Sequence, residues 1–169
     1  AGLPAALAFA GWSTRRRRPL RRPLLAGIAA GMLAWAAFGG LLVAMQRSAP
    51  PLPAFELATL DGEPTTLAAL SGRPMVLNLW ATWCPPCRRE MPVLADAQQR
   101  YPEVVFVLAN QGEDRGTIAE YLAATGLALD HVLLDPQSRA MLETGTRGLP
   151  TTLFFDAGGR LVDTHMGEL

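Results

Sequence analysis

The only two cysteines in the sequence stand three positions apart, Cys84 and Cys87, with Pro85 and Pro86 between them. They follow an apolar run and open a predicted helix. A thiol there faces free backbone N–H groups and the positive end of the helix dipole, which favour its thiolate. Cysteines three apart across a first helical turn are also close enough to bridge. The spacing therefore favours a pair that alternates between dithiol and disulfide, the chemistry of thiol–disulfide exchange.

Three other interpretations of the cysteine pair fit the sequence less well. A zinc site would need His131 and His165 as further ligands, and their separations from the cysteines match no common zinc pattern. A purely structural disulfide would close a four-residue loop and add little stability. A peroxide-reducing thiol would not need a second cysteine three residues on, and no matching Thr-x-x-Cys pattern precedes the pair. We therefore expect no metal at this site.

The residues around the pair affect the reactivity of a Cys84 thiolate. The two prolines fit the start of a helix, where a missing N–H costs little, but they remove two possible donors to sulfur. The N–H of Cys87 and those beyond it must then solvate the thiolate. Arg88 and Arg89 oppose the helix dipole at this position, yet their positive field would favour the thiolate. A solvated basic turn is the alternative interpretation.

The elements that must position the cysteines alternate between strands and helices. The run 75–81 is almost continuously apolar, as in a strand buried on both faces, and 86–100 follows it as a helix. The segments 151–155 and 160–165 predict a hairpin. Further strands are predicted at 55–60, 104–109 and 131–134, helices at 114–125 and 136–143, and a strand or helical turn at 65–70. The alternation indicates an α/β fold with a mixed sheet between helices.

Charge divides the chain into an N-terminal region and a body. Residues 1–50 carry seven Arg and no acidic residue, whereas residues 51–169 carry eight Arg against fifteen acidic residues, a net charge of −7. Half of all residues are hydrophobic, which excludes a disordered chain. The acidic body has no basic excess to neutralise phosphates, which argues against nucleic-acid binding.

An uncharged apolar stretch covers residues 24–45 and, as a helix of roughly 33 Å, is long enough to cross a bilayer. Six Arg precede it and only Arg47 follows closely, so the positive-inside rule places the N-terminus in the cytoplasm and the body outside. A cleaved signal peptide is the alternative, although its apolar region is normally about 7–15 residues. We expect a cytoplasmic Arg-rich segment at 1–23, a transmembrane signal anchor at 24–45, a Pro-rich linker at 46–54 and a folded domain at 55–169.

Two runs of the sequence resemble the signatures of the membrane-anchored thioredoxin-like proteins of the TlpA/ResA type. The first extends from Val76 through the cysteine pair to Pro92, and the second from Gly148 to Asp156; residues 110–113 resemble the start of the family's extra segment. The resemblance covers residues 55–169. It implies a thioredoxin-like fold with the family-type insertion, in a protein of the bacterial inner membrane that faces the periplasm or the cell exterior. The family normally adds a C-terminal helix, which is missing here, so we expect a fragment truncated at both ends.

The resemblance also implies roles for individual residues. Cys84 matches the nucleophile that attacks a substrate disulfide, and Cys87 matches the thiol that resolves the mixed disulfide. Pro150 matches the family's cis-proline, and with Leu149 it would pack beside Cys84 and offer backbone to an extended substrate. Trp83 is interpreted as a half-exposed platform beside the sulfurs, with a core aromatic as the alternative.

Two further positions depart from ordinary thioredoxin. Asn78 stands where thioredoxin has a buried Asp, and Asn cannot take a proton. Glu90 lies three residues after Cys87 on the same helix face and matches the acid of the TlpA/ResA type. Our hypothesis is that Glu90 manages the proton of Cys87 and tunes the redox potential. The alternative is a first-turn Glu that interacts only with the helix dipole.

The sequence therefore predicts a membrane-tethered, extracytoplasmic thiol–disulfide oxidoreductase that reduces protein disulfides through Cys84 and Cys87. The resemblance implies work in cytochrome c maturation or copper-centre assembly. A membrane thiol transporter would supply electrons, a disulfide-containing protein would be the substrate, and no cofactor is expected. The alternatives are an oxidase or isomerase of the same fold, and a copper-handling module without exchange activity.

Overall fold

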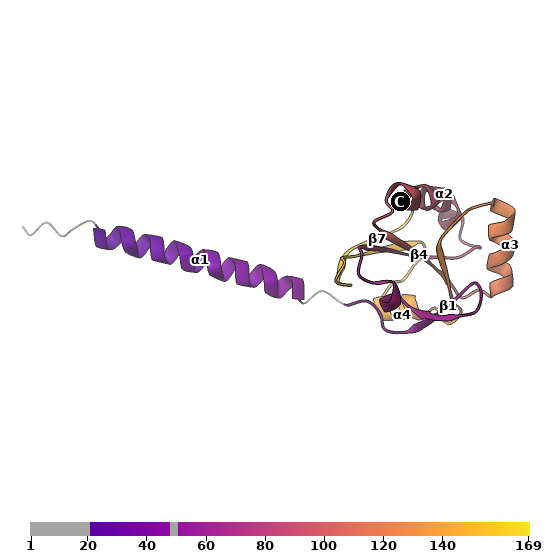
Figure 1. Ribbon diagram of the computed structural model, residues 1–169, viewed down its shortest axis with the longest axis horizontal. Helices are drawn as coiled ribbons and strands as arrows, with labels where there is room; N and C mark the ends of the chain where they lie inside the picture. Colours follow the sequence, from indigo (N-terminus) through magenta and orange to yellow (C-terminus); the bar gives the residue numbers. More distant parts are fainter. Residues whose placement is uncertain (1–20, 48–50) are drawn as a thin grey trace, which may run out of the picture. The chain divides into compact units, whose positions relative to one another are not determined.

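The computed structural model describes residues 21–47 and 51–169 of the chain (Figure 1). The chain divides between Arg47 and Ser48 into two compact units. Most of the predicted cytoplasmic segment, residues 1–20, and part of the predicted linker, residues 48–50, lie outside the described residues.

In its described residues the first unit is a single helix, α1 (Arg21–Arg47), which encloses the apolar stretch predicted at 24–45. Its segment Gly27–Met45 has a mean hydropathy of 2.0 and is long and apolar enough to cross a membrane. Large apolar side chains such as Leu33 and Trp35 are 72% and 82% exposed. Such a surface is unfavourable in water and favourable in hydrocarbon.

The second unit is built on a seven-stranded mixed sheet in the order β2-β1-β5-β4-β3-β6-β7. The strands are β1 (Glu56–Thr59), β2 (Pro64–Thr66), β3 (Met75–Trp80), β4 (Val105–Gln111), β5 (His131–Asp135), β6 (Thr151–Phe155) and β7 (Leu161–Met166). β3, β4 and β5 run parallel in the middle, and antiparallel strands complete both sides. β3 is paired on both edges, and its apolar side chains let both of its faces be buried. The predicted α/β fold with a mixed sheet is confirmed.

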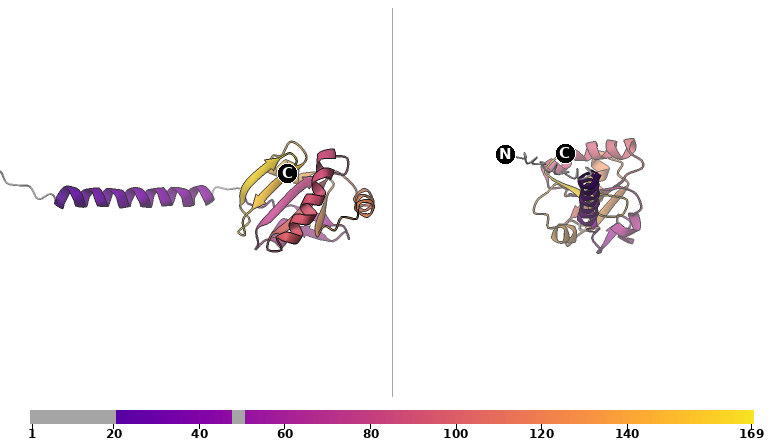
Figure 2. Two further views of the ribbon diagram at one scale, coloured as in Figure 1. Left: turned by 90° about the horizontal axis from the view of Figure 1, so that it is seen from above. Right: turned by 90° about the vertical axis from the view of Figure 1, so that its left-hand side faces the viewer.

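Two apolar layers cover the two faces of the sheet. The helices are α2 (Pro85–Arg100), α3 (Arg115–Thr125), α4 (Arg139–Thr144) and the single-turn η1 (Leu67–Leu70). α2 and α3 contribute to one layer, which includes Trp80 and Ile118. η1 and α4 contribute to the other, which includes Leu79 and Ala140. Figure 2 shows α2 lying across its face of the sheet. The alternation of side chains along β3 thus directs neighbouring residues to opposite layers.

The helix predicted at 136–143 begins later than expected, at Arg139. The carboxylate of Asp135 accepts hydrogen bonds from the N–H groups of Arg139 at 2.9 Å and Ala140 at 2.8 Å, and so satisfies the first free donors of α4. Ser138 has a φ of 51°, in the left-handed region, which interrupts the helical conformation before Arg139. The element predicted at 65–70 divides between the end of β2 and η1.

Part of the predicted linker is built into the second unit. The N–H of Leu52 donates to the carbonyl of Gly159 at 2.8 Å, and Pro51 forms an isolated antiparallel bridge with Arg160. Gly159 has a φ of +72°, and a Cβ on it would lie 3.0 Å from the side chain of Leu52. The β6–β7 turn therefore requires glycine here, and it fixes the segment that precedes β1.

Candidate active site

The cysteine pair lies where β3 ends and α2 begins. β3 is held between β4 and β6, so its carboxyl end has a fixed position in the middle of the sheet. Cys84 is the N-cap of α2, and its Sγ accepts a hydrogen bond from the N–H of Cys87 at 3.3 Å. Pro85 and Pro86 occupy the first helical positions, where their missing N–H groups cost little. The structure thus places the pair at the positive end of the helix dipole, as predicted.

Cys84 and Cys87 form a disulfide, with their Cα atoms 5.3 Å apart. Both residues are buried, at 3% and 0% exposure, in the apolar layer between α2 and the sheet. Beside them Trp83 is 67% exposed, so the interpretation of Trp83 as a core aromatic is wrong and an accessible surface adjoins Cys84. Of the two cysteines, Cys84 is the one next to this surface.

The loop before β6 contacts the apolar cluster that contains the pair. The Leu149–Pro150 peptide bond is cis, as the family resemblance implied. Thr151 pairs with Leu79, which places this loop opposite the carboxyl end of β3. Leu149 packs against the apolar cluster that contains both cysteines. The structure therefore brings Leu149 and the cysteines together.

Glu90 is buried beneath α2, on the same face as Cys87, at 1% exposure. Its Oε1 accepts from Asn78 Nδ2 at 2.8 Å, and its Oε2 accepts from the N–H of Leu169 at 3.2 Å. Burial raises the pKa of Glu90 above its ordinary value, although the hydrogen bonds from Asn78 and Leu169 oppose the shift. The carboxyl group therefore has a stronger tendency to hold a proton than an exposed Glu. The alternative of an acid that only interacts with the helix dipole does not account for these buried contacts.

Asn78 links Glu90 to the neighbouring strand. Its Nδ2 also donates to Thr152 Oγ1 at 3.0 Å, whereas its buried Oδ1 has no hydrogen-bond partner among the described residues. Rotation of this amide would present an acceptor oxygen to a protonated Glu90. Asn78 can therefore accompany a change of protonation on Glu90 without titrating itself.

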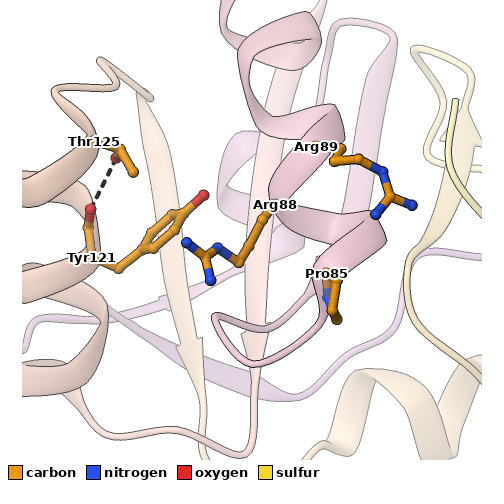
Figure 3. A pocket seen from close by; sticks show the side chains of 5 residues that line it. All are labelled: Pro85, Arg88, Arg89, Tyr121 and Thr125. Atoms are coloured by element: carbon orange, nitrogen blue, oxygen red, sulfur yellow. Dashed lines mark hydrogen bonds between the residues drawn. The ribbon is translucent and has the colours of Figure 1, made fainter.

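The two arginines after the pair point to opposite sides of α2 (Figure 3). Arg89 forms an ion pair with Glu168, with its Nε 2.9 Å from Oε2. Arg88 lies over the ring of Tyr121, with its guanidinium carbon 5.8 Å from the ring centroid. The prediction that both cations act on Cys84 was incomplete, because it missed Glu168, which offsets the charge of Arg89.

Glu113 holds the loop that leads to Cys84, a function that sequence reasoning missed. One carboxylate oxygen accepts from the N–H of Thr82 and from Asn110 Nδ2, both at 2.7 Å, and the other accepts from the Thr82 hydroxyl. Glu113 follows β4 and Thr82 follows β3, and these strands are parallel neighbours. The carboxyl ends of parallel strands meet at one edge of a sheet. The position of Glu113 just after a predicted strand that runs beside β3 could therefore have indicated its contact with Thr82.

The two histidines considered as zinc ligands do not meet. His131 lies in β5 and His165 in β7, with β4, β3 and β6 between them in the sheet. Within residues 21–47 and 51–169, no three His, Cys, Asp or Glu side chains form a group that could hold a metal ion.

Comparison with known proteins gives consistent matches. The Redoxin family profile matches residues 47–169. Over 117 residues the chain is 33% identical to the thiol-disulfide oxidoreductase ResA of Halalkalibacterium halodurans, covering 68% of this chain and 66% of that protein. Over 120 residues it is 36% identical to the thiol:disulfide interchange protein DsbE of Pseudomonas fluorescens biotype C, covering 70% and 66%. The chain thus spans just under two thirds of the length of these relatives.

A solved structure also matches. DsbF of Mycobacterium tuberculosis, determined in mixed oxidised and reduced forms, superposes with a TM-score of 0.63 at 30% identity, covering 70% of this chain and 90% of that one. The predicted thioredoxin-like fold is confirmed.

Proposed function

The chain belongs to the Redoxin family and, within it, to the thioredoxin-like proteins of the TlpA/ResA type, and from this premise we propose that it is a membrane-tethered thiol–disulfide oxidoreductase that reduces protein disulfides. One observation carries the proposal. Cys84 and Cys87 bridge the first turn of α2, at the carboxyl end of a central strand and beside the exposed Trp83. A pair so placed can open and close without movement of the sheet.

The exchange proceeds in two displacements at sulfur. In the reduced protein the Cys84 thiolate attacks one sulfur of the substrate disulfide; the Cys84–substrate bond forms and the other substrate sulfur leaves as a thiolate, which takes a proton. Cys87 then loses its proton and attacks Cys84 Sγ. The Cys84–Cys87 disulfide forms, and the second substrate sulfur leaves. Two electrons pass to the substrate, which becomes a dithiol.

Glu90 is assigned to the proton of Cys87. The carboxyl is buried on the same face of α2, three residues further along, and burial favours its protonated form. A group that holds a proton near Cys87 in one redox state and releases it in the other makes the second displacement depend on pH. Glu90 therefore acts on the resolving thiol, and Cys84 depends on the helix N-terminus.

The surroundings of Cys84 support the direction of reduction. A strongly oxidising pair has a reduced form in which the thiolate is heavily stabilised. Here the two prolines offer no N–H, Glu168 offsets the charge of Arg89, and the Arg88 guanidinium lies over the Tyr121 ring. Among the described residues, the N–H of Cys87 donates to Cys84 Sγ. Weaker stabilisation of the thiolate makes the dithiol the better electron donor.

α1 and the charge asymmetry support the proposed location. The helix is apolar enough to span a bilayer, and Arg residues precede it in excess. Both features favour insertion in the bacterial inner membrane with the second unit in the periplasm or outside the cell.

NADPH is not available outside the cytoplasm, so a membrane thiol transporter is the proposed electron donor. The proposed substrates are protein disulfides of the kind reduced in cytochrome c maturation or copper-centre assembly.

An exchange assay tests the function. The full chain in detergent micelles, reduced and freed of reductant, is mixed with a synthetic peptide that contains one disulfide, and free peptide thiols are counted. We expect one peptide disulfide to be reduced per protein, and Cys84→Ser to abolish the reaction. Absence of reduction by the unsubstituted protein contradicts the proposal, and stoichiometric Cu(I) binding without exchange would favour the copper-handling alternative.

A further inference from the structure

A cavity of about 350 Å³ opens between the start of α2 and the helix α3, next to the cysteine pair (Figure 3). Its lining residues are Pro85, Arg88, Arg89, Tyr121 and Thr125. Pro85 directly follows Cys84, so a chain segment bound at Cys84 could reach this cavity within a few residues. The two displacements at sulfur do not involve this cavity.

Arg88 and Arg89 both line this cavity, and Arg89 is paired with Glu168. Arg88 is the cation considered for binding a ligand. Its guanidinium lies over the Tyr121 ring, and that ring in turn contacts the buried Trp80, with the two centroids 5.4 Å apart. A cation–π contact uses the charge of a guanidinium, and the N–H groups that do not face the ring can still bind a carboxylate. The packing thus orients the cation before any ligand arrives.

Arg88 contacts the Tyr121 ring but has no carboxylate partner within the part of the chain that the structure describes. Arg89 is paired with Glu168, Arg100 with Asp96 and Arg160 with Asp156, whereas Arg88 forms no ion pair among the described residues. Residues 51–169 carry a net charge of −7, yet none of their carboxylates lines this cavity. An oriented, unpaired cation beside the reactive pair of an acidic domain indicates an anionic partner group.

We infer that this cavity is a subsite for a carboxylate side chain of the substrate protein, an Asp or Glu within a few residues of the disulfide that Cys84 attacks. The inference rests on the proposed function and adds a preference to it. A carboxylate there would bind the edge of Arg88, with the Tyr121 ring behind it. Arg88 would then favour substrates with an acidic residue near the disulfide. This local attraction would oppose the repulsion between such a substrate and the net negative charge of the domain.

Three peptides test the subsite. They share one disulfide and differ only in the residues that flank it, which are Glu, Gln or Lys. With the reduced full chain in detergent micelles, each chain reducing one peptide, we expect the second-order rate constant for the Glu peptide to exceed that for the Gln peptide by about two- to fivefold, the range of a partly exposed ion pair, and the Lys peptide to be slowest. Arg88→Gln should remove this preference, so that the Glu and Gln peptides react at the same rate as each other. Arg88→Lys should restore only part of it, because an ammonium lacks the planar fork.

The matched control is Arg139→Gln, which removes the same charge from α4, on the other layer of the fold. It should leave the preference intact. If Arg88→Gln slows all three peptides by one common factor, Arg88 acts on the Cys84 thiolate and the subsite is refuted. A Glu preference that persists in Arg88→Gln refutes it as well. Failure of the unsubstituted protein to reduce any peptide overturns the proposed function and the subsite together, whereas reduction without discrimination overturns the subsite alone.

Discussion

Replacement of Glu113 by alanine should loosen the loop that carries Trp83 and Cys84. The Glu113 carboxylate accepts the N–H and the hydroxyl of Thr82 and the side-chain amide of Asn110. Its partner Thr82 lies 31 residues earlier, so the contact fastens the β3–α2 loop to the end of β4. Without this contact, Thr82 is no longer held in place, and the backbone between Trp80 and Cys84 becomes more mobile.

The size of the stability loss depends on whether water can replace the carboxylate at each of its three hydrogen-bond donors. The two donors of Thr82 are only partly buried, so water can replace the carboxylate at about 0.5–1.5 kcal/mol each. Asn110 is fully buried and its Oδ1 already lacks a partner, so its orphaned amide N–H costs about 1–3 kcal/mol. We expect Glu113→Ala to lower the free energy of unfolding by about 2–6 kcal/mol. Glu113→Gln, which keeps one acceptor oxygen, should lose about half of that.

Urea unfolding of the oxidised full chain in detergent micelles measures the stability loss, and the exchange assay measures the loss of rate. The control is Glu120→Ala, which removes the same charge from an exposed position on α3. We expect the control to change the free energy of unfolding by no more than about 0.5 kcal/mol. If Glu113→Ala and Glu120→Ala lose the same stability and exchange at the same rate, the loop does not depend on Glu113 and the reasoning is refuted.

Three further predictions concern other parts of the site and the fold. Cys87→Ser should accumulate a mixed disulfide between Cys84 and the substrate, visible on non-reducing gels, and Cys84→Ser should not; equal trapping by both would contradict the assignment of the nucleophile. The pKa of Glu90 is raised above 4.5 in the folded protein, so the free energy of unfolding should fall as pH rises from 4.5 through that pKa. Glu90→Gln should abolish this fall in pH-dependent denaturation, and an unchanged profile would exclude Glu90 as its source. Asp135→Ala removes the acceptor for the first N–H groups of α4 and should cost about 1–2 kcal/mol in urea unfolding; a loss below about 0.5 kcal/mol would contradict that role.

The parts of the site that depend on neighbouring residues were predictable from the sequence. The apolar run of β3 and the cysteine spacing fix a buried strand, a tight loop and a helix start within a dozen residues. Burial of Glu90 on the face of Cys87 follows from the helical period. These features need only local geometry, and the structure places them as expected.

The contacts that join distant segments were not predictable in the same way. Glu113 meets Thr82 across 31 positions, and Glu168 meets Arg89 across 79. Both depend on the order of strands in the sheet, which periodicity does not specify. The start of α4 was predicted too early because hydrophobic spacing does not report that Asp135, at the end of a strand, supplies the cap.

The reduction potential of the Cys84–Cys87 pair tests the central claim most directly. The full chain in detergent micelles is equilibrated with buffers of defined thiol–disulfide ratio, and the two thiols are counted after acid trapping. A reductase with a weakly stabilised Cys84 thiolate should have a potential near that of thioredoxin, about −270 mV. A potential near about −120 mV, typical of a strongly oxidising pair, would contradict the account.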